Sequence, residues 1–264
     1  AGFIGRNVAA ELNRRGTDRI LIVDDLGTDE RWKNLRGLKF EEILTIAEFR
    51  AAVAADRLPA VRTVYHLGAC SATTETDADY LLENNFRQTA DLAGWCLERG
   101  IRFIYASSAA TYGDGSRGYR DDDATTRTLT PLNMYGYSKQ MFDMYALERG
   151  WQTGIVGLKF FNVFGPNENH KGDMRSVVNK AHAALVEGRD YPLFRSHRPD
   201  FADGEQRRDF VWIKDVVNVV MHFLERPGTN GIFNVGSGRA ASFNELLTAV
   251  YRALDRTPEI TYVD

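Results

Sequence analysis

The chain has 264 residues, of which 44% are hydrophobic and 26% charged, and its formal net charge is −3. This composition is typical of a folded protein with one large domain or two unequal lobes, and it argues against disorder, a nucleic-acid partner and a membrane partner. No apolar run reaches the ~18 residues of a transmembrane helix. The two cysteines, Cys70 and Cys96, exclude a disulfide scaffold and indicate a reducing, cytoplasmic location.

Both ends of the chain interrupt a pattern. The chain begins AGFIG, without an initiator methionine and without the charged start of a signal peptide. Residues 260–264 end the chain inside an expected strand. We therefore expect a fragment, with the first strand of the fold preceding Ala1.

Short apolar runs alternate with amphipathic segments along most of the chain. Residues 6–16, for example, carry Val8, Ala9 and Leu12 at helical spacing and end at Gly16. Helices are predicted at residues 6–16, 78–99, 133–149, 174–187, 214–225 and 243–254, and strands at residues 19–24, 62–67, 101–106, 153–159 and 231–235. This alternation predicts an α/β fold, a Rossmann-type doubly wound parallel sheet with a smaller C-terminal lobe.

The regular alternation ends near residue 165, and residues 195–208 form a polar loop. We predict a dinucleotide-binding domain over residues 1–165 and a mainly substrate-binding lobe over residues 166–264. The strand and helix near residues 209–225 are expected to return to the first domain. No metal site is expected.

The glycines at the start of the chain lead directly into a predicted helix. Gly2 and Gly5 would let the backbone approach a pyrophosphate at the helix N-terminus. Asp24 ends the next strand, about 20 residues further on, where an acid can bond ribose hydroxyls. Arg31, in the following loop, could hold a 2′-phosphate. A glycine-rich helix start and a turn-capping aspartate are the structural alternatives.

The segment YGYSK at residues 135–139 begins another predicted helix. Tyr135 and Lys139 stand at i and i+4, so they share one helix face. A lysine ammonium beside a phenol lowers its pKa, and the phenolate can take a proton from an alcohol. Ser108 ends the preceding strand, where it could hydrogen-bond the reacting hydroxyl. A solvated Tyr–Lys pair is the structural alternative, but the whole constellation resembles the extended short-chain dehydrogenase/reductase superfamily.

Lys171 lies in the segment HKGDM, just before a predicted helix. In the structural interpretation Lys171 decorates a loop and Asp173 caps that helix. In the functional interpretation Lys171 is a second proton-transfer group, because partial burial would lower the pKa of its amine. Arg207 and Arg208 offer guanidinium groups for phosphate, or form surface ion pairs with Asp209 or Glu205.

Five segments of the chain together carry a more specific resemblance: GACSATTE, ASSAATYG, YGYSK, FNVFGPNENHKGDM and RRDFVWIKDV. They resemble the ADP-heptose 6-epimerases of the NAD-dependent epimerase/dehydratase family. The resemblance implies a homo-oligomer, a homopentamer, that epimerises carbon 6 of an ADP-heptose for lipopolysaccharide core biosynthesis, with NADP or NAD bound. It also implies that Tyr135 and Lys171 are the acid/base residues and that Lys139 and Ser108 support Tyr135.

The resemblance further implies two sets of binding residues. The implied cofactor residues are Gly2, Phe3, Ile4, Gly5, Asp24, Asp25, Arg31, Leu67, Gly68, Ala69, Cys70, Ser71, Asn84, Lys139, Val163 and Lys171. The implied substrate residues are Ser108, Asn162, Asp173, Lys180, Phe194, Arg195, Ser196, His197 and Arg208.

Two other functions stay open at this point. One is a related 4-epimerase or 4,6-dehydratase that acts on a UDP- or dTDP-sugar. A dehydratase needs an acid pair after the catalytic serine, and Ala109 and Ala110 stand there instead. The other is a non-catalytic dinucleotide-binding redox sensor, which would have no need of Ser108, Tyr135 and Lys139.

Overall fold

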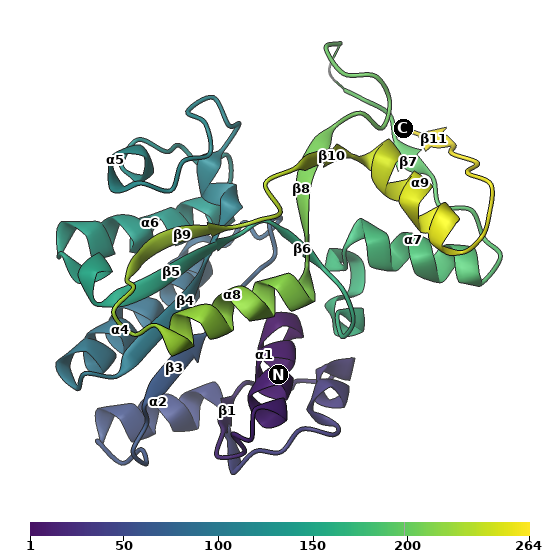
Figure 1. The fold of residues 1–264 in the computed structure, drawn as a ribbon. Coiled ribbons are helices and arrows are strands. Elements are labelled where there is room, and N and C mark those ends of the chain that lie inside the picture. Colours follow the sequence, from purple (N-terminus) through teal and green to yellow (C-terminus); the bar gives the residue numbers. More distant parts are fainter. Residues whose placement is uncertain (198) are drawn as a thin grey trace. The chain divides into compact units, whose positions relative to one another are not determined.

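The computed structural model describes residues 1–197 and 199–264 and divides into two compact units. The first unit comprises Ala1–Phe160 and Val217–Val235, and the second comprises Phe161–Val216 and Gly236–Asp264. Figure 1 shows the elements of both units in chain order. No helix among the described residues is both long enough and apolar enough to cross a bilayer.

A parallel sheet of four strands, in the order β3-β4-β5-β9, forms the centre of the first unit. Its strands are β3 (Thr63–His66), β4 (Arg102–Ser108), β5 (Ile155–Phe160) and β9 (Gly231–Val235). All six residues of β5 are buried, as expected for a strand with helices on both faces of its sheet. A separate parallel pair joins β1 (Leu21–Val23) to β2 (Glu42–Leu44).

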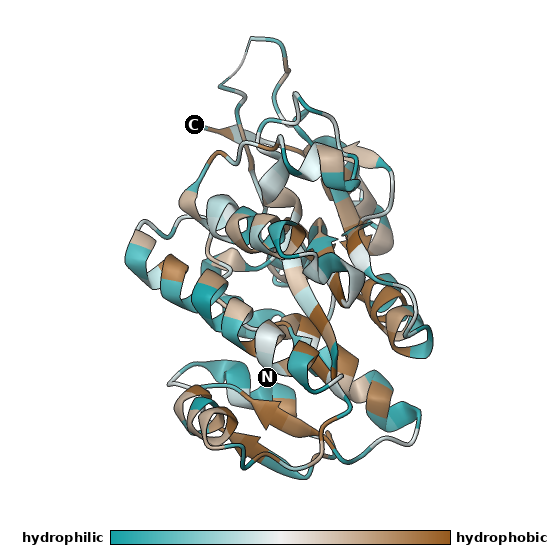
Figure 2. Ribbon diagram, turned by 90° about the vertical axis from the view of Figure 1, so that its left-hand side faces the viewer, coloured by the Kyte–Doolittle hydropathy of each residue, from teal (hydrophilic) through white to brown (hydrophobic). Residues whose placement is uncertain are grey.

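Helices surround these strands, and Figure 2 shows how the helices alternate hydrophobic and hydrophilic residues. They are α1 (Phe3–Arg14), α2 (Ile46–Ala54), α3 (Ala78–Leu81), α4 (Gln88–Glu98), α5 (Asp123–Thr126), α6 (Met134–Glu148) and α8 (Ile213–Glu225), with the short helices η1 (Glu30–Leu35), η3 (Ala109–Tyr112) and η4 (Trp151–Thr153). One core cluster joins α4 and α6 to β4 and β5 through Cys96, Phe103, Tyr105, Phe142 and Ile155.

The predicted helix at residues 78–99 contains a π-helical segment. It consists of α3, the π-helix η2 (Leu82–Arg87) and α4. Such π segments are uncommon and often occur at functional sites. Here the segment contains Asn85, which is almost completely buried.

The second unit has a small mixed sheet in the order β10-β8-β6. Strand β8 (Arg207–Trp212) runs parallel to β6 (Asn162–Phe164) and antiparallel to β10 (Ala240–Ser242). A further parallel pair joins β7 (Leu193–Phe194) and β11 (Tyr262–Val263). The other elements are η5 (Asn169–Met174), α7 (Val177–Val186) and α9 (Phe243–Ala253), and α7 and α9 share a core that includes Leu185, Leu247 and Tyr251.

Two local expectations for the C-terminal part differ from the structure. The helix predicted from residue 174 begins at Val177, because Ser176 rather than Asp173 is its N-cap and accepts a hydrogen bond from the backbone of Asn179. The strand near residue 209 does not join the large sheet, because β8 pairs with β6 and β10 in the second unit. Within this part of the chain, Val217–Val235, which starts inside α8, groups with the first unit.

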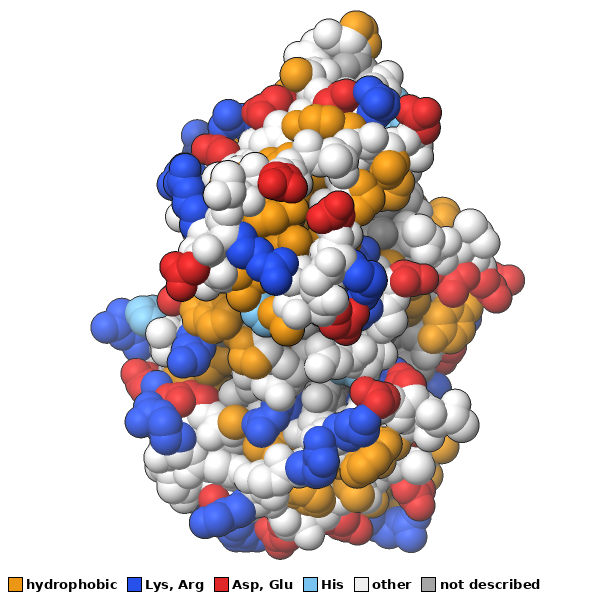
Figure 3. Space-filling view, turned by 90° about the vertical axis from the view of Figure 1, so that its right-hand side faces the viewer, with side chains coloured by type: hydrophobic (Ala, Val, Ile, Leu, Met, Phe, Trp, Pro, Cys, Tyr) orange, Lys and Arg blue, Asp and Glu red, His pale blue; other side chains and the backbone are white. Residues whose placement is uncertain are grey.

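On the face drawn in Figure 3, basic and acidic side chains are intermingled, with hydrophobic patches between them. This face therefore has no broad region of a single charge. Residue 198, within the predicted polar loop at residues 195–208, lies outside the described part of the chain.

Candidate functional site

The start of α1 is open in the way that a phosphate site requires. Gly2 is the N-cap, no side chain caps the helix, and its first turn contains no acidic residue. A Cβ built on Gly2 or Gly5 would meet no atom within 4 Å. Because helix N-termini present N–H groups without intrahelical acceptors, this end of α1 can receive an anion.

Asp24 and Arg31 meet beside the start of α1. The nitrogen of Ala1 lies 2.9 Å from Asp24 Oδ2, so the acid at the end of β1 is adjacent to the glycine turn. The Arg31 guanidinium donates to Asp24 Oδ1 at 2.9 Å and to the carbonyl oxygen of Asp25 at 3.1 Å. It also pairs with Asp29 at 3.3 Å. Asp24, Asp25 and Arg31, which the sequence analysis assigned to the cofactor site, therefore lie in one cluster.

The loop after β3 is attached to helix α6 through the side chain of Asn85. The backbone N–H of Cys70 donates to Asn85 Oδ1 at 2.9 Å, and Asn85 Nδ2 donates to the Cys70 carbonyl at 3.1 Å. Asn85 Nδ2 also donates to Ser138 Oγ at 2.9 Å. Asn84, the residue predicted from the resemblance, instead donates to the Tyr80 carbonyl of its own helix.

Asn85 is thus a residue that the sequence analysis did not assign. The sequence shows two adjacent asparagines, at residues 84 and 85, and the π-helix determines which of the two side chains faces the loop. At the loop itself Ala69 has a φ of 136°, a conformation that side chains rarely adopt. Asn85 therefore holds a strained turn in the predicted cofactor segment.

Tyr135 lies at the start of α6, which approaches η3 closely. Asn133 caps the helix by accepting from the Gly136 N–H at 2.7 Å. A Cβ on Gly136 would lie 2.7 Å from the Ala110 carbonyl oxygen, so a larger residue would push α6 away. This close approach places Tyr135 near enough to Ser108 for the serine to influence the pKa of the phenol.

Burial changes the pKa of both Tyr135 and Lys139. The pKa of Tyr135 is raised by desolvation, and the hydrogen bond with Ser108 opposes this shift. Lys139 is buried, its Nζ donates to the Ala106 carbonyl at 2.9 Å, and desolvation lowers its pKa to about 8. The expectation that Lys139 lowers the pKa of Tyr135 is not met in this structure, because desolvation raises that pKa and the opposing influence comes from Ser108.

A buried ion pair lies one helical turn beyond Lys139. Asp143 accepts from Lys159 at 2.7 Å, from the Tyr105 hydroxyl at 2.8 Å and from the Ser107 hydroxyl at 2.7 Å. Both charged side chains are fully buried. Lys159 also donates to Thr111 at 2.9 Å, and the Thr111 hydroxyl donates to the carbonyl of Ser108 at 2.8 Å. The network thus supports the strand end that carries Ser108.

In the second unit, Lys171 lies on the short helix η5. Gly172, which follows it, kinks this helix with a φ of 54°. Desolvation lowers the pKa of Lys171, and the negative charge of Glu168 opposes that shift. Lys180 Nζ, from α7, donates to the carbonyl of Asp173 in η5 at 3.2 Å, so these two predicted substrate residues lie close together.

The remaining predicted substrate residues lie on exposed segments of the second unit. Phe194 is 71% exposed on β7, and Arg195 pairs with Asp203 at 3.3 Å. The backbone of Ser196 donates to the same aspartate at 2.8 Å. His197 is exposed in the loop that follows. Among the described residues, these side chains are available to a ligand but do not enclose one.

Arg207 and Arg208 are both exposed, and as neighbours in β8 they point to opposite faces of the strand. Arg208 donates to the carbonyl of Arg207 at 2.7 Å. The alternative of an ion pair with Asp209 is wrong, because that carboxylate accepts from the backbone of Ser237 and Gly238 at 2.7 and 2.8 Å. The two arginines therefore serve different surfaces.

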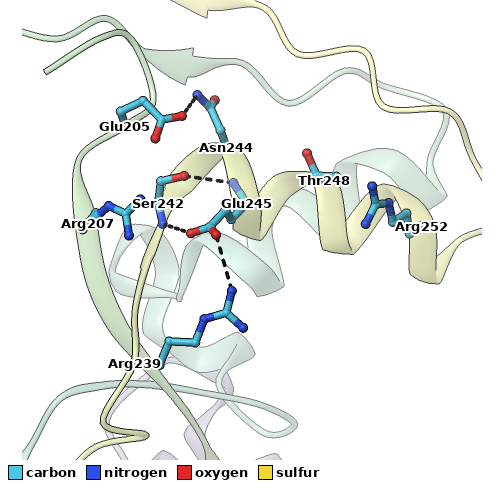
Figure 4. A pocket seen from close by; sticks show the side chains of 8 residues that line it. All are labelled: Glu205, Arg207, Arg239, Ser242, Asn244, Glu245, Thr248 and Arg252. Carbon is cyan, nitrogen blue, oxygen red and sulfur yellow. Dashed lines mark hydrogen bonds and ion pairs between the residues drawn. The ribbon is translucent and has the colours of Figure 1, made fainter.

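A polar cavity of about 500 Å³ lies on the Arg207 side of the second unit (Figure 4). Its lining comprises Glu205, Arg207, Arg239, Ser242, Asn244, Glu245, Thr248 and Arg252. Glu245 closes a capping box with Ser242 and pairs with Arg239 at 3.4 Å. Arg207 lines this cavity, but none of the cofactor or substrate residues implied by the resemblance does.

Comparisons with known proteins bear on the family and the fold of the chain. The model of a family described as the NAD dependent epimerase/dehydratase family matches residues 1–236. An ADP-L-glycero-D-manno-heptose-6-epimerase of Nitratidesulfovibrio vulgaris (strain DP4) is 54% identical over 265 residues, which covers 100% of this chain and 82% of the relative.

Two solved structures share the fold. The Helicobacter pylori ADP-L-glycero-D-manno-heptose-6-epimerase matches with a TM-score of 0.82 at 26% identity, over 99% of this chain and 82% of that one. The Thermus thermophilus UDP-glucose 4-epimerase, in complex with NAD, matches with a TM-score of 0.79 at 27% identity, over 99% of this chain and 83% of that one. These likenesses confirm the predicted Rossmann-type α/β fold.

Proposed function

The chain belongs to the NAD dependent epimerase/dehydratase family, and on this premise we propose that it interconverts the two carbon-6 epimers of an ADP-glycero-manno-heptose. The observation that carries this proposal is the 54% identity with a heptose 6-epimerase over the full length of the chain. The fold alone does not separate the candidates, since a 6-epimerase and a 4-epimerase match with TM-scores of 0.82 and 0.79. The enzyme is an isomerase that uses a nicotinamide cofactor.

The described residues fit such a cofactor. The open start of α1 suits its pyrophosphate, and Asp24 stands where an acid can bond a ribose. The proposed cofactor-binding residues also include the loop at residues 67–71, which Asn85 holds, and Val163. A nicotinamide bound there would supply reversible hydride transfer with the sugar, and the complete cycle would have no net redox change.

The residues of the chain then carry the protons. Tyr135 Oη exchanges a proton with the oxygen on carbon 6 for one epimer, while Ser108 holds the phenol in place. Lys171 Nζ does the same for the other epimer, and desolvation lowers its pKa in the direction that favours the neutral amine a base needs. Lys139 fixes the strand end through Ala106. Two proton carriers are required because inversion at one carbon presents two opposite faces.

The substrate is proposed to contact residues of the second unit. Asn162, Asp173, Lys180 and Arg208 would meet the sugar and its diphosphate, together with the exposed segment from Phe194 to His197. An arginine suits a diphosphate because its planar fork can bond two oxygens. We also propose that the protein is a cytoplasmic homopentamer that serves lipopolysaccharide synthesis. Light scattering on the purified protein tests the oligomeric state.

The test of the proposed reaction is direct. Purified enzyme is incubated with ADP-D-glycero-D-manno-heptose, and the carbon-6 epimers are separated by chromatography. We expect both epimers at equilibrium from either starting compound, with no net formation of reduced cofactor. UDP-glucose under the same conditions should remain unconverted. Conversion of UDP-glucose to its 4-epimer without heptose turnover would contradict the proposal.

NADP rather than NAD is the proposed cofactor, and Arg31 is the residue that would bind its 2′-phosphate. Because Arg31 already bonds Asp24, the phosphate would have to take over part of this cluster. We expect Arg31→Ala to weaken NADP binding by about 1–3 kcal/mol, as for loss of a charge-assisted hydrogen bond, and to affect NAD less. Arg36→Ala, which removes an arginine that stacks on Trp32 nearby, is the matched control. Calorimetry that finds equal losses for both cofactors would remove Arg31 from this role.

A further inference from the structure

Glu168 is a fully buried carboxylate in the second unit, three residues before Lys171. Its Oε1 accepts from the Gly165 N–H at 3.2 Å and from the Ser176 hydroxyl at 2.7 Å. Its Oε2 accepts from the Ser176 N–H at 2.6 Å. Three donors therefore share one carboxylate, and each of them is a neutral N–H or O–H group.

These donors belong to two different elements. Gly165 directly follows β6. It has a φ of 149°, and a Cβ at this position would lie 2.3 Å from Ile213 Cγ2. Ser176 is the N-cap of α7. The carboxylate therefore pins both ends of the segment that contains Lys171.

The backbone of Glu168 holds the middle of the same segment. Its carbonyl oxygen accepts from the Lys171 N–H at 3.0 Å. One residue thus contacts the strand end, the helix cap and the lysine backbone. Nothing else among the described contacts of η5 links all three, and the kink at Gly172 gives this short helix little rigidity of its own.

We propose that Glu168 is a positioning residue for Lys171, which holds the irregular turn so that the lysine amine stays at the reacting carbon. This inference rests on the proposed function, in which Lys171 carries a proton. The residue acts through Lys171 and is not expected to touch the sugar. Its importance follows from the requirement that a proton carrier be placed to within a fraction of an ångström.

A glutamine at this position would not replace the carboxylate. An ionised carboxylate accepts at both oxygens, whereas a primary amide offers one acceptor and a donating NH₂ group. If the amide oxygen took the place of Oε1, its NH₂ would face the Ser176 N–H, and two donors would meet. Glu168→Gln therefore keeps the size of the side chain but disrupts the hydrogen bonds that link Glu168 to Gly165 and Ser176.

The experiment compares Glu168→Gln, Lys171→Met and the double variant in the epimerase assay. We expect Glu168→Gln to lower kcat about 10- to 100-fold with KM changed less than about threefold, as for a misplaced catalytic group. In the Lys171→Met background the same substitution should lower kcat no further. Glu187→Gln, which removes an exposed glutamate that pairs with Arg189 at the end of α7, is the control and should leave kcat unchanged.

A second readout follows Lys171 without turnover. The rate at which an amine-reactive acylating reagent modifies Lys171 is measured by peptide mass spectrometry in the wild type, Glu168→Gln and Glu187→Gln. Release of the turn should make this rate at least about threefold faster in Glu168→Gln alone. An unchanged rate together with an unchanged kcat would overturn the inference, and so would equal kcat losses in both backgrounds.

The outcomes separate the inference from the function on which it rests. Full activity of Lys171→Met with faster acylation in Glu168→Gln would refute the proton-carrying role of Lys171. It would leave standing the inference that Glu168 holds the turn. A large loss of activity in Lys171→Met with wild-type behaviour of Glu168→Gln would refute only the positioning role of Glu168. If Glu168→Gln does not fold, Ser176→Ala removes one donor and should give the same pattern with a smaller loss, about 3- to 10-fold.

Discussion

The two units hold their proposed proton carriers in different ways. In the first unit, Tyr135 and Lys139 project from the regular helix α6, and the ion pair of Asp143 and Lys159 anchors that helix to β4 and β5. In the second unit, Lys171 sits on a kinked turn, and the buried carboxylate of Glu168 ties it down through neutral donors. One carrier is placed by secondary structure and the other by a single side chain.

This difference has an energetic side. A buried ion pair gains little net stability over an apolar pair, but losing one partner leaves a charge without compensation. A carboxylate that accepts three hydrogen bonds needs no cation, although each donor must stay in place. The first unit should therefore respond to substitution mainly in stability, and the second mainly in the rate of the reaction that depends on Lys171.

The largest effect is expected at Tyr135. Tyr135→Phe removes the phenolic proton carrier and keeps the ring, so the rate should fall about 10²–10⁴-fold while substrate binding is largely kept. Tyr137→Phe, on the exposed side of the same helix, is the control and should match the wild type. Steady-state kinetics with both epimers provide the measurement. Turnover of Tyr135→Phe close to the wild-type rate would mean that the first unit does not supply a proton carrier.

The buried ion pair offers a sharper contrast in stability. Lys159→Met leaves Asp143 charged and buried, and it should cost about 3–5 kcal/mol of the free energy of unfolding. Adding Asp143→Asn should recover part of that loss, because the uncompensated charge is gone. The amide can accept from one of the Tyr105 and Ser107 hydroxyls and donate to the other. Denaturant unfolding measures both variants.

A surface pair gives the scale for that loss. Lys39 lies 3.4 Å from Asp18, and Lys39 is 74% exposed. Lys39→Met should therefore change the free energy of unfolding by no more than about 1 kcal/mol. If Lys159→Met cost as little as Lys39→Met, the ion pair would not be what anchors α6.

The same comparison explains what could be predicted from the sequence. Tyr135 and Lys139 are recognisable because helical spacing places i and i+4 on one face, and Ser108 because parallel strands end at a common edge. The alternating elements likewise predict the parallel sheet. These inferences depend on local periodicity, which the chain carries in its residue order.

The residues that the sequence analysis missed depend on contacts between distant segments. Asn85 was indistinguishable from Asn84 until a π-helix turned it toward the loop at Cys70. Glu168 and Asp143 carry no motif, and their importance comes from partners in other elements. The raised pKa of Tyr135 was also missed, since desolvation depends on packing that spacing does not describe.

The most informative effect for the second unit is expected at Lys171. If Lys171 only decorates the turn, Lys171→Met should leave activity within a few-fold of the wild type. If it carries the second proton, epimerisation should fall about 10²-fold in both directions, because every complete cycle uses both faces of the sugar. Lys214→Met, an exposed lysine of the same unit, is the control.

Half-reactions separate the two carriers further. Tyr135 remains in Lys171→Met, so oxidation of one epimer should partly survive, and an analogue with an aldehyde at carbon 6 would expose it. The double variant Tyr135→Phe/Lys171→Met should be little worse over the complete cycle than the poorer single variant, since both groups serve one sequence of steps. More than about a third of the wild-type rate in both directions for Lys171→Met would return the lysine to a structural role. The second face of the sugar would then need another proton carrier, and the difference between the two units would concern folding alone.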